Sequence, residues 1–199
     1  MDGTILSSGR IGPNAVTRLA EALAARHGAA TCEAVFAAAG QARHLLAPPG
    51  RMVPEGDVTA LHRTLRAMLG AAAADGVARD AGRLTARYLL AHRIPRALQA
   101  VLRRLPPALA ARLLLGAIGR HAWTFAGSGS FRSLGRAPLR LAIRGGPIAR
   151  AGAADHPACG YYAATFETLF RALVSPHSRA EETECEACGA PDCIFELRW

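Results

Sequence analysis

Hydrophobic residues in the first half of the chain recur with the spacing of α-helices. Apolar side chains return every three or four positions within four segments, at residues 11–27, 31–46, 57–69 and 76–92. This period places them on one face of each helix. Gly28 is expected to end the first helix, and Thr31 and Asp57 to cap the N-termini of the second and third. The pattern therefore predicts a series of amphipathic helices.

Two further helices are predicted between residues 95 and 121, joined at Pro106-Pro107. Their apolar positions are flanked by five arginines: Arg96, Arg103, Arg104, Arg112 and Arg120. One interpretation is an ordinary pair of amphipathic helices packed on a core. The other is a basic, apolar surface that contacts a membrane or a large apolar ligand.

After Gly119 the pattern changes to the alternation that is typical of β-strands. Short alternating segments, separated by glycines, predict strands at 122–125, 130–133 and 138–143. A helix is predicted next, and then a hairpin of two strands; their ranges are 160–174, 179–186 and 193–198.

The predicted fold class is α+β, with N-terminal helices packed on a mostly antiparallel sheet. We expect an N-terminal helical segment at residues 1–69 and a ligand-binding domain at residues 70–199. The length of the chain favours one compact unit that contains both parts.

The charge is unevenly distributed along the chain. The formal net charge is +9, and lysine is absent. Residues 1–180 hold 23 arginines against nine acidic residues, whereas residues 181–199 hold one arginine against six. This balance fits either a biased genome or a surface for acidic ligands or anionic lipid. Nucleic acid is not an expected partner, because the arginines are scattered along helices without interleaved aromatic residues.

The odd number of cysteines, and an N-terminus without a signal-peptide pattern, favour a reducing cytoplasm. Clustered cysteines in that compartment bind metal more often than they form disulfides. No uninterrupted apolar run reaches about 18 residues, so no transmembrane helix is expected.

Most of the cysteines lie near the end of the chain. Three of them have the spacing Cys185-x2-Cys188-x4-Cys193, and a hairpin would bring the first and the last together. Cys159 precedes the helix that leads into this hairpin. With Glu182, three thiolates would complete the closed four-coordinate set of a structural zinc site. Cys188 is a rival ligand for an all-thiolate site, and a hairpin with unligated thiols is the other alternative.

Two motifs resemble the 4-vinyl reductase domain family. The first is the closing run Glu182-Thr-x-Cys185-x7-Cys193-x-Phe195, and the second is the segment 82–95. The resemblance covers roughly residues 70–199. It implies an α+β sandwich, often a homodimer, that encloses an apolar pocket between its helices and its sheet.

The resemblance also implies a ligand set for the metal. In related sensor domains, zinc is held by Cys, Glu, Cys and Cys. By resemblance, this pattern falls on Cys159, Glu182, Cys185 and Cys193, with Cys188 as an extra thiol. A zinc ion at these positions would pin the C-terminal hairpin.

Over its full length the pattern is similar to the bacteriochlorophyll-biosynthesis members of this family. That similarity implies a chlorophyll-precursor tetrapyrrole as ligand, with pathway enzymes as partners and a cytoplasmic position, peripheral to the photosynthetic membrane. No dinucleotide, flavin or iron–sulfur motif stands out in the sequence, and zinc has no redox chemistry. We therefore expect a carrier or assembly factor. The alternatives are a vinyl reductase that borrows electrons to reduce a divinyl (proto)chlorophyllide, and a small-molecule sensor or trafficking module.

A magnesium tetrapyrrole fits an apolar slot with aromatic walls, with an imidazole for the metal and an arginine for the propionate. The candidate pocket residues are Tyr88, His92, His121, Trp123 and Phe125. Candidate partners for the carboxylate are Arg87, Arg93 and Arg120. For each of these side chains, ordinary packing or solvation is the competing interpretation.

Overall fold

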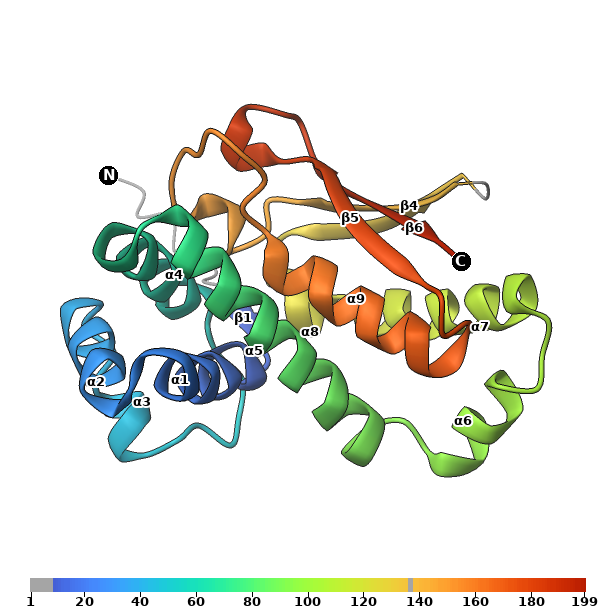
Figure 1. Ribbon diagram of the computed structural model, residues 1–199, viewed down its shortest axis with the longest axis horizontal. Coiled ribbons are helices and arrows are strands. Elements are labelled where there is room, and N and C mark those ends of the chain that lie inside the picture. Colours follow the sequence, from blue (N-terminus) through green and yellow to red (C-terminus); the bar gives the residue numbers. More distant parts are fainter. Residues whose placement is uncertain (1–8, 136–137) are drawn as a thin grey trace, which may run out of the picture.

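The computed structural model describes residues 9–135 and 138–199. Helices come first in the chain and a sheet comes last (Figure 1). The helices are α1 Asn14–His27, α2 Ala29–Ala38, α3 Arg43–Leu46, α4 Glu55–Leu69, α5 Ala71–His92, α6 Arg96–Leu102, α7 Pro107–Arg120, α8 Trp123–Ala126 and α9 Gly160–Leu173. The strands are β1 Arg10–Ile11, β2 Val53–Pro54, β3 Ser130–Leu134, β4 Leu139–Arg144, β5 Arg179–Glu184 and β6 Cys193–Arg198.

The main sheet is antiparallel throughout and has the strand order β3-β4-β6-β5. Strand β6 is therefore central, between β4 and β5, and Phe195 faces Leu141 on one side and Glu182 on the other. Strands β1 and β2 form a separate short pair. The predicted α+β class is confirmed, as are the helix at 160–174 and both hairpin strands, to within two residues.

Helix α9 lies between the sheet and α5 (Figure 1). Its first seven residues, Gly160–Phe166, are all buried, as expected for a helix covered on more than one side. One connected cluster of buried apolar side chains extends from Ile11 in β1 to Leu197 in β6. The N-terminal helices and the sheet thus share a single hydrophobic core, and α9 holds one end of the metal-binding candidates in a fixed place.

The close approach of α5 to α9 depends on Gly82. A Cβ atom at this position would lie 2.2 Å from the carbonyl oxygen of Tyr161, a backbone atom that cannot easily move. We expect Gly82→Ala to lower the free energy of unfolding by about 1–3 kcal/mol, although alanine in a helix is otherwise favoured by up to about 1 kcal/mol. Urea denaturation measures the change.

Gly116 in α7 is the matched control for Gly82. A Cβ atom there would meet only the end of the flexible Arg120 side chain, at 4.0 Å. We expect Gly116→Ala to raise the free energy of unfolding by up to about 1 kcal/mol. Equal effects of the two substitutions would show that the approach of α5 to α9 is not tight.

The prediction of a strand at 122–125 is wrong, because these residues belong to the helical turn α8. The carbonyl oxygen of His121 accepts the N–H of Thr124, and that of Ala122 accepts the N–H groups of Phe125 and Ala126. This turn directs Phe125 to the aromatic side chains of the core, 5.4 Å from the ring of Phe131 between centroids. A segment this short shows alternation and one helical turn equally well.

The predicted N-caps are also wrong. Helix α2 begins directly after Gly28, and the Thr31 hydroxyl donates to the carbonyl oxygen of His27 instead. Helix α4 begins at Glu55, and Asp57 lies within its first turn. There the Asp57 carboxylate forms ion pairs with Arg43 and His44 at 2.7 and 2.9 Å.

Candidate metal centre

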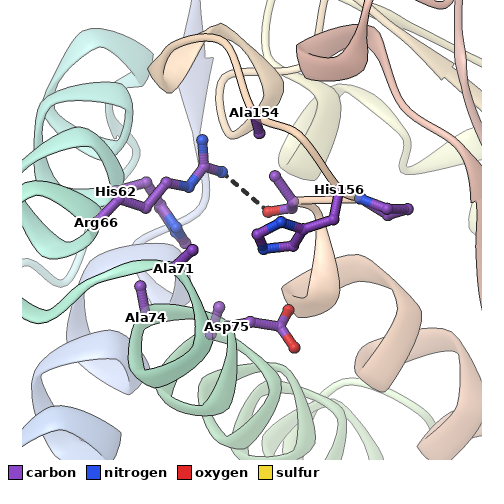
Figure 2. Close-up of a pocket in the computed structure, with 10 residues that line it drawn as sticks. His62, Arg66, Ala71, Ala74, Asp75, Ala154 and His156 are labelled. Carbon is purple, nitrogen blue, oxygen red and sulfur yellow. Dashed lines mark hydrogen bonds between the residues drawn. The ribbon is translucent and has the colours of Figure 1, made fainter.

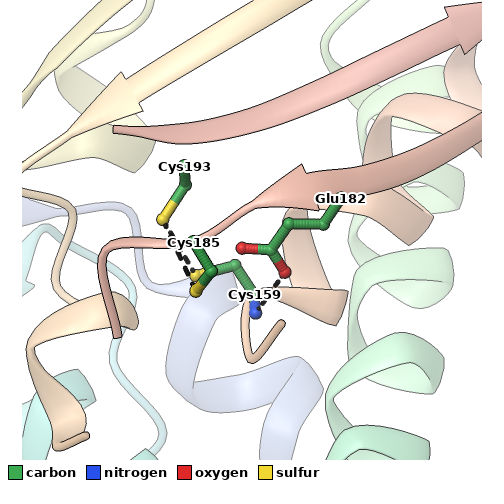
Figure 3. A group of neighbouring side chains, drawn as sticks. All are labelled: Cys159, Glu182, Cys185 and Cys193. Atoms are coloured by element: carbon green, nitrogen blue, oxygen red, sulfur yellow. Dashed lines mark hydrogen bonds between the residues drawn. The ribbon is translucent and has the colours of Figure 1, made fainter. Parts of the chain in front are cut away.

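Four side chains from three elements meet beside the N-terminus of α9 (Figure 3). Cys159 is the residue before α9, Glu182 lies in β5, Cys185 follows β5, and Cys193 begins β6. One possible ligand atom from each side chain lies within 4.8 Å of the other three, and all four residues are buried. The hairpin and the turn into α9 therefore bring together residues that are up to 34 positions apart in sequence.

The sulfur atoms have the separations of a shared metal rather than of a disulfide. The Sγ atoms of Cys159 and Cys193 are 3.6 Å apart, and those of Cys193 and Cys185 are 3.9 Å apart. A disulfide would need about 2.0 Å. Two thiolates on one tetrahedral zinc, each at about 2.3 Å, are about 3.8 Å apart. The three thiols thus have the spacing that zinc requires.

Glu182 supplies the carboxylate from an unusual position. Strand β5 alternates between exposed and buried residues, and Glu182 occupies a buried position with 6% of its surface exposed. Its Oε2 accepts the backbone N–H of Cys159 at 2.8 Å, and its Oε1 has no hydrogen-bond partner among the described residues. Such a buried, unpaired carboxylate oxygen is costly unless a cation or a proton satisfies it.

The electrostatics of the cluster also favour a cation. Burial raises the pKa of Glu182 to about 8, and its interaction with Cys185 contributes in the same direction. Hydrogen bonds to the thiols of Cys185 and Cys193, together with burial, raise the pKa of Cys159 well above its ordinary value. Four acidic groups in one buried site oppose each other's ionisation, and a divalent ion at their centre reverses this effect.

Cys188 lies outside the cluster. Its side chain is exposed, and it ends the short 3₁₀ turn η2, Glu186–Cys188. The turn is closed by Gly189, whose φ of 91° is a left-handed conformation that favours glycine. The structure therefore brings together the four residues that the resemblance implied, and it separates the rival thiol from them.

The acidic end of the chain supports the cluster through pairs with the sheet. Both carboxylate oxygens of Glu186 accept the backbone N–H of Gly145 at 2.9 Å. Asp192 accepts two hydrogen bonds from Arg144, at 2.8 and 3.1 Å, and it also pairs with Arg132. The sequence showed an acidic segment here but did not identify these arginines as its partners.

A small polar cavity lies beside the metal-binding candidates (Figure 2). Its volume is about 20 Å³, which is room for one water-sized molecule. His62, Arg66 and Asp75 line it, and each has a buried polar atom without a hydrogen-bond partner among the described residues. The second Arg66 nitrogen donates to the carbonyl oxygen of Ala158 at 2.9 Å. This cavity is far too small for a tetrapyrrole, and sequence analysis did not find its residues.

A larger, open groove lies at the outer edge of the hairpin. It has a volume of about 360 Å³. Its lining residues are His177, Arg179, Glu181, Glu196, Arg198 and Trp199. The groove combines an imidazole, arginines and an indole, but acidic side chains lie among them.

The structure distributes the candidate pigment residues over three places. Tyr88 and His92 lie together at the end of α5, with ring centroids 4.8 Å apart. His121 and Trp123 are exposed at the junction of α7 and α8, whereas Phe125 packs against core aromatic rings. Among the described residues, no aromatic ring contact joins these three places. Their role in binding a pigment stays a prediction.

Within the described ranges, no helix combines the length and the apolar character that crossing a membrane requires. This finding agrees with the expectation from the sequence.

Comparison with known proteins identifies the class of this chain. Residues 139–199, which contain the four clustered side chains, match the family model of the 4-vinyl reductase domain. The resemblance to this domain family is thereby confirmed.

Two curated relatives are similar over almost the whole chain, and both are named bacteriochlorophyll synthase 23 kDa chain. The protein from Cereibacter sphaeroides is 45% identical over 188 residues, which cover 94% of this chain and 90% of the relative. The protein from Rhodobacter capsulatus is 42% identical over 188 residues, covering 94% and 86%. The chain belongs to the family of bacteriochlorophyll synthase 23 kDa chains.

Among solved structures, a similar one is the phenol-responsive sensory domain of the transcription activator PoxR with phenol. The two share 17% sequence identity with a TM-score of 0.45, over 73% of this chain and 74% of that one.

Proposed function

We propose that this chain acts in bacteriochlorophyll biosynthesis as a carrier or assembly factor, which binds a magnesium tetrapyrrole precursor and presents it to the enzymes of the pathway. The observation that carries this proposal is the identity of 45% to a bacteriochlorophyll synthase 23 kDa chain over 94% of the sequence. In this proposal the chain holds the pigment without transforming it. A homodimer, and a cytoplasmic position at the photosynthetic membrane, stay predictions.

The metal in this proposal is a structural zinc ion. Cys159, Glu182, Cys185 and Cys193 offer three sulfur atoms and one oxygen atom, which together fill a tetrahedral coordination sphere. A catalytic zinc instead keeps one position open for water or substrate. A filled site in a buried place supports a role in holding the hairpin to α9, and zinc supplies no electrons for the reduction of a vinyl group.

The best-supported pigment contact is the end of α5. His92 is exposed there, so its imidazole is free to reach a magnesium ion, and Tyr88 presents a ring beside it. The Arg18 guanidinium lies 5.2 Å from the centre of the Tyr88 ring and holds it in place. Arg87 and Arg93 are exposed on either side and are suited to a propionate.

The test is a titration of the purified protein with a divinyl magnesium tetrapyrrole, followed by its absorption spectrum. We expect a shifted band, and we expect His92→Ala to bind roughly tenfold more weakly, a loss of about 1.4 kcal/mol. His177→Ala is the control, since His177 is an exposed histidine in the hairpin groove. A loss in His177→Ala alone would move the pigment site to that groove.

Addition of NADPH to the same mixture separates a carrier from a reductase. A carrier leaves the vinyl groups unchanged when no other protein is present. Conversion of the divinyl pigment by the purified chain would refute the carrier proposal, and the absence of any spectral shift with this pigment would refute pigment binding.

A further inference from the structure

Consecutive helices at one end of the molecule expose more apolar surface than a soluble domain needs (Figure 1). Trp123 in α8 is 58% exposed, and four aliphatic side chains in α6 and α7 are 41–51% exposed: Leu98, Val101, Leu109 and Leu113. Helix α7 already buries Ala110, Ala111 and Leu114 against the core. Its leucines at the exposed face are therefore additional to those that folding requires.

The same helices carry positive charge without acidic neighbours. Six exposed arginines lie in or beside them: Arg93, Arg96, Arg103, Arg104, Arg112 and Arg120. The sequence has no aspartate or glutamate from residue 81 to residue 154. Within residues 9–135 and 138–199, none of these six arginines forms an ion pair with a carboxylate.

Arginines in the sheet are arranged differently, which shows that this charge is not a uniform effect of composition. Arg132 and Arg144 pair with Asp192, whereas Arg140 and Arg198 pair with Glu196. The acidic end of the chain thus neutralises the sheet and leaves the α6–α8 helices uncompensated. Repulsion among these arginines costs free energy that an external anionic surface would recover.

We propose that the basic apolar surface, defined as the exposed side chains of α6, α7 and α8 named above, docks the protein on a bilayer that contains anionic lipids. Aliphatic side chains with arginines around them match the boundary between acyl chains and headgroups, and tryptophan is enriched at that depth. Nucleic acid would use the arginines but not the exposed leucines. This inference goes beyond the proposed function and does not depend on it.

Co-sedimentation with vesicles tests the docking surface. The full chain is expected to bind vesicles of phosphatidylcholine mixed with phosphatidylglycerol, and to bind phosphatidylcholine alone much more weakly. Each arginine near an anionic surface contributes about 1 kcal/mol, so the double variant Arg104→Gln/Arg112→Gln should bind roughly 25-fold more weakly. Trp123→Gln should reduce binding to both kinds of vesicle.

Arg51→Gln/Arg179→Gln is the matched control, because it removes the same charge from exposed positions outside the surface. We expect it to bind the mixed vesicles as the unmodified chain does. Equal losses in both double variants would assign the binding to net charge alone and overturn the proposal, as would equal binding to neutral and anionic vesicles or no binding to either. Because pigment binding is measured separately by absorption, failure of either proposal leaves the other to be judged by itself.

Discussion

Serine in place of Cys159 is expected to abolish zinc binding and to release the C-terminal hairpin from α9. Cys159 is fully buried, and its Sγ is 3.6 Å from that of Cys193. Structural zinc contributes about 10–16 kcal/mol of apparent binding free energy in small zinc domains, so the loss of one of four ligands should cost a large part of the stability of this region. Metal analysis of the purified protein, together with thermal unfolding, measures both effects.

Two further substitutions decide the identity of the ligands. Glu182→Gln should lose zinc, because it replaces the carboxylate that Oε1 and Oε2 present to the site. Cys188→Ser should keep zinc, because its thiol is exposed and outside the cluster. Zinc that is retained in Glu182→Gln and lost in Cys188→Ser would establish the all-thiolate site instead.

Removal of the metal from the unmodified chain provides a test that does not depend on how the variants fold. A strong chelator should lower the thermal midpoint, and added zinc should restore it. Chain that folds with the same midpoint before and after removal would show that the cluster has no structural role.

The metal-binding candidates could be found from the sequence because their information is local. The thiols of Cys185 and Cys193 flank a turn between two short strands, and hairpin pairing alone brings such positions together. Glu182 was also detectable, since a glutamate occupies a position in β5 where the alternation calls for a buried side chain. Cys159 required more, because its approach depends on how α9 packs against the sheet.

The polar cavity could not be predicted, because its residues belong to segments that meet only in the folded chain. His62 comes from α4, Asp75 from α5 and His156 from the segment before α9. His62 does lie on the buried stripe of α4 beside Val58 and Leu61, and that is the one sequence signal for it. The helical turn α8 escaped for another reason, because four residues of alternating size satisfy the period of a strand as well as that of a helix.

His62 should make the stability of this protein fall steeply in acid. Burial lowers the pKa of His62 to about 3, and the charge of Arg66 adds to that shift. In the unfolded chain its pKa returns to about 6.5. Below pH 6.5 the unfolded chain binds a proton that the folded chain excludes, so the free energy of unfolding should fall by up to about 1.4 kcal/mol per pH unit until about pH 3. Above pH 6.5 this contribution is constant.

The comparison that isolates His62 is with His62→Gln, which has a similar size and does not titrate. Zinc release in acid, and the titration of Asp75 and His156 around the same cavity, affect both proteins, so the difference between their free energies of unfolding carries the His62 contribution. That difference should change with pH only below about 6.5, and the exposed His177→Gln should show no such change relative to the unmodified chain. Parallel profiles for the unmodified chain and His62→Gln would mean that His62 reaches a solvent-exposed position before it titrates, and that the cavity opens in acid without unfolding.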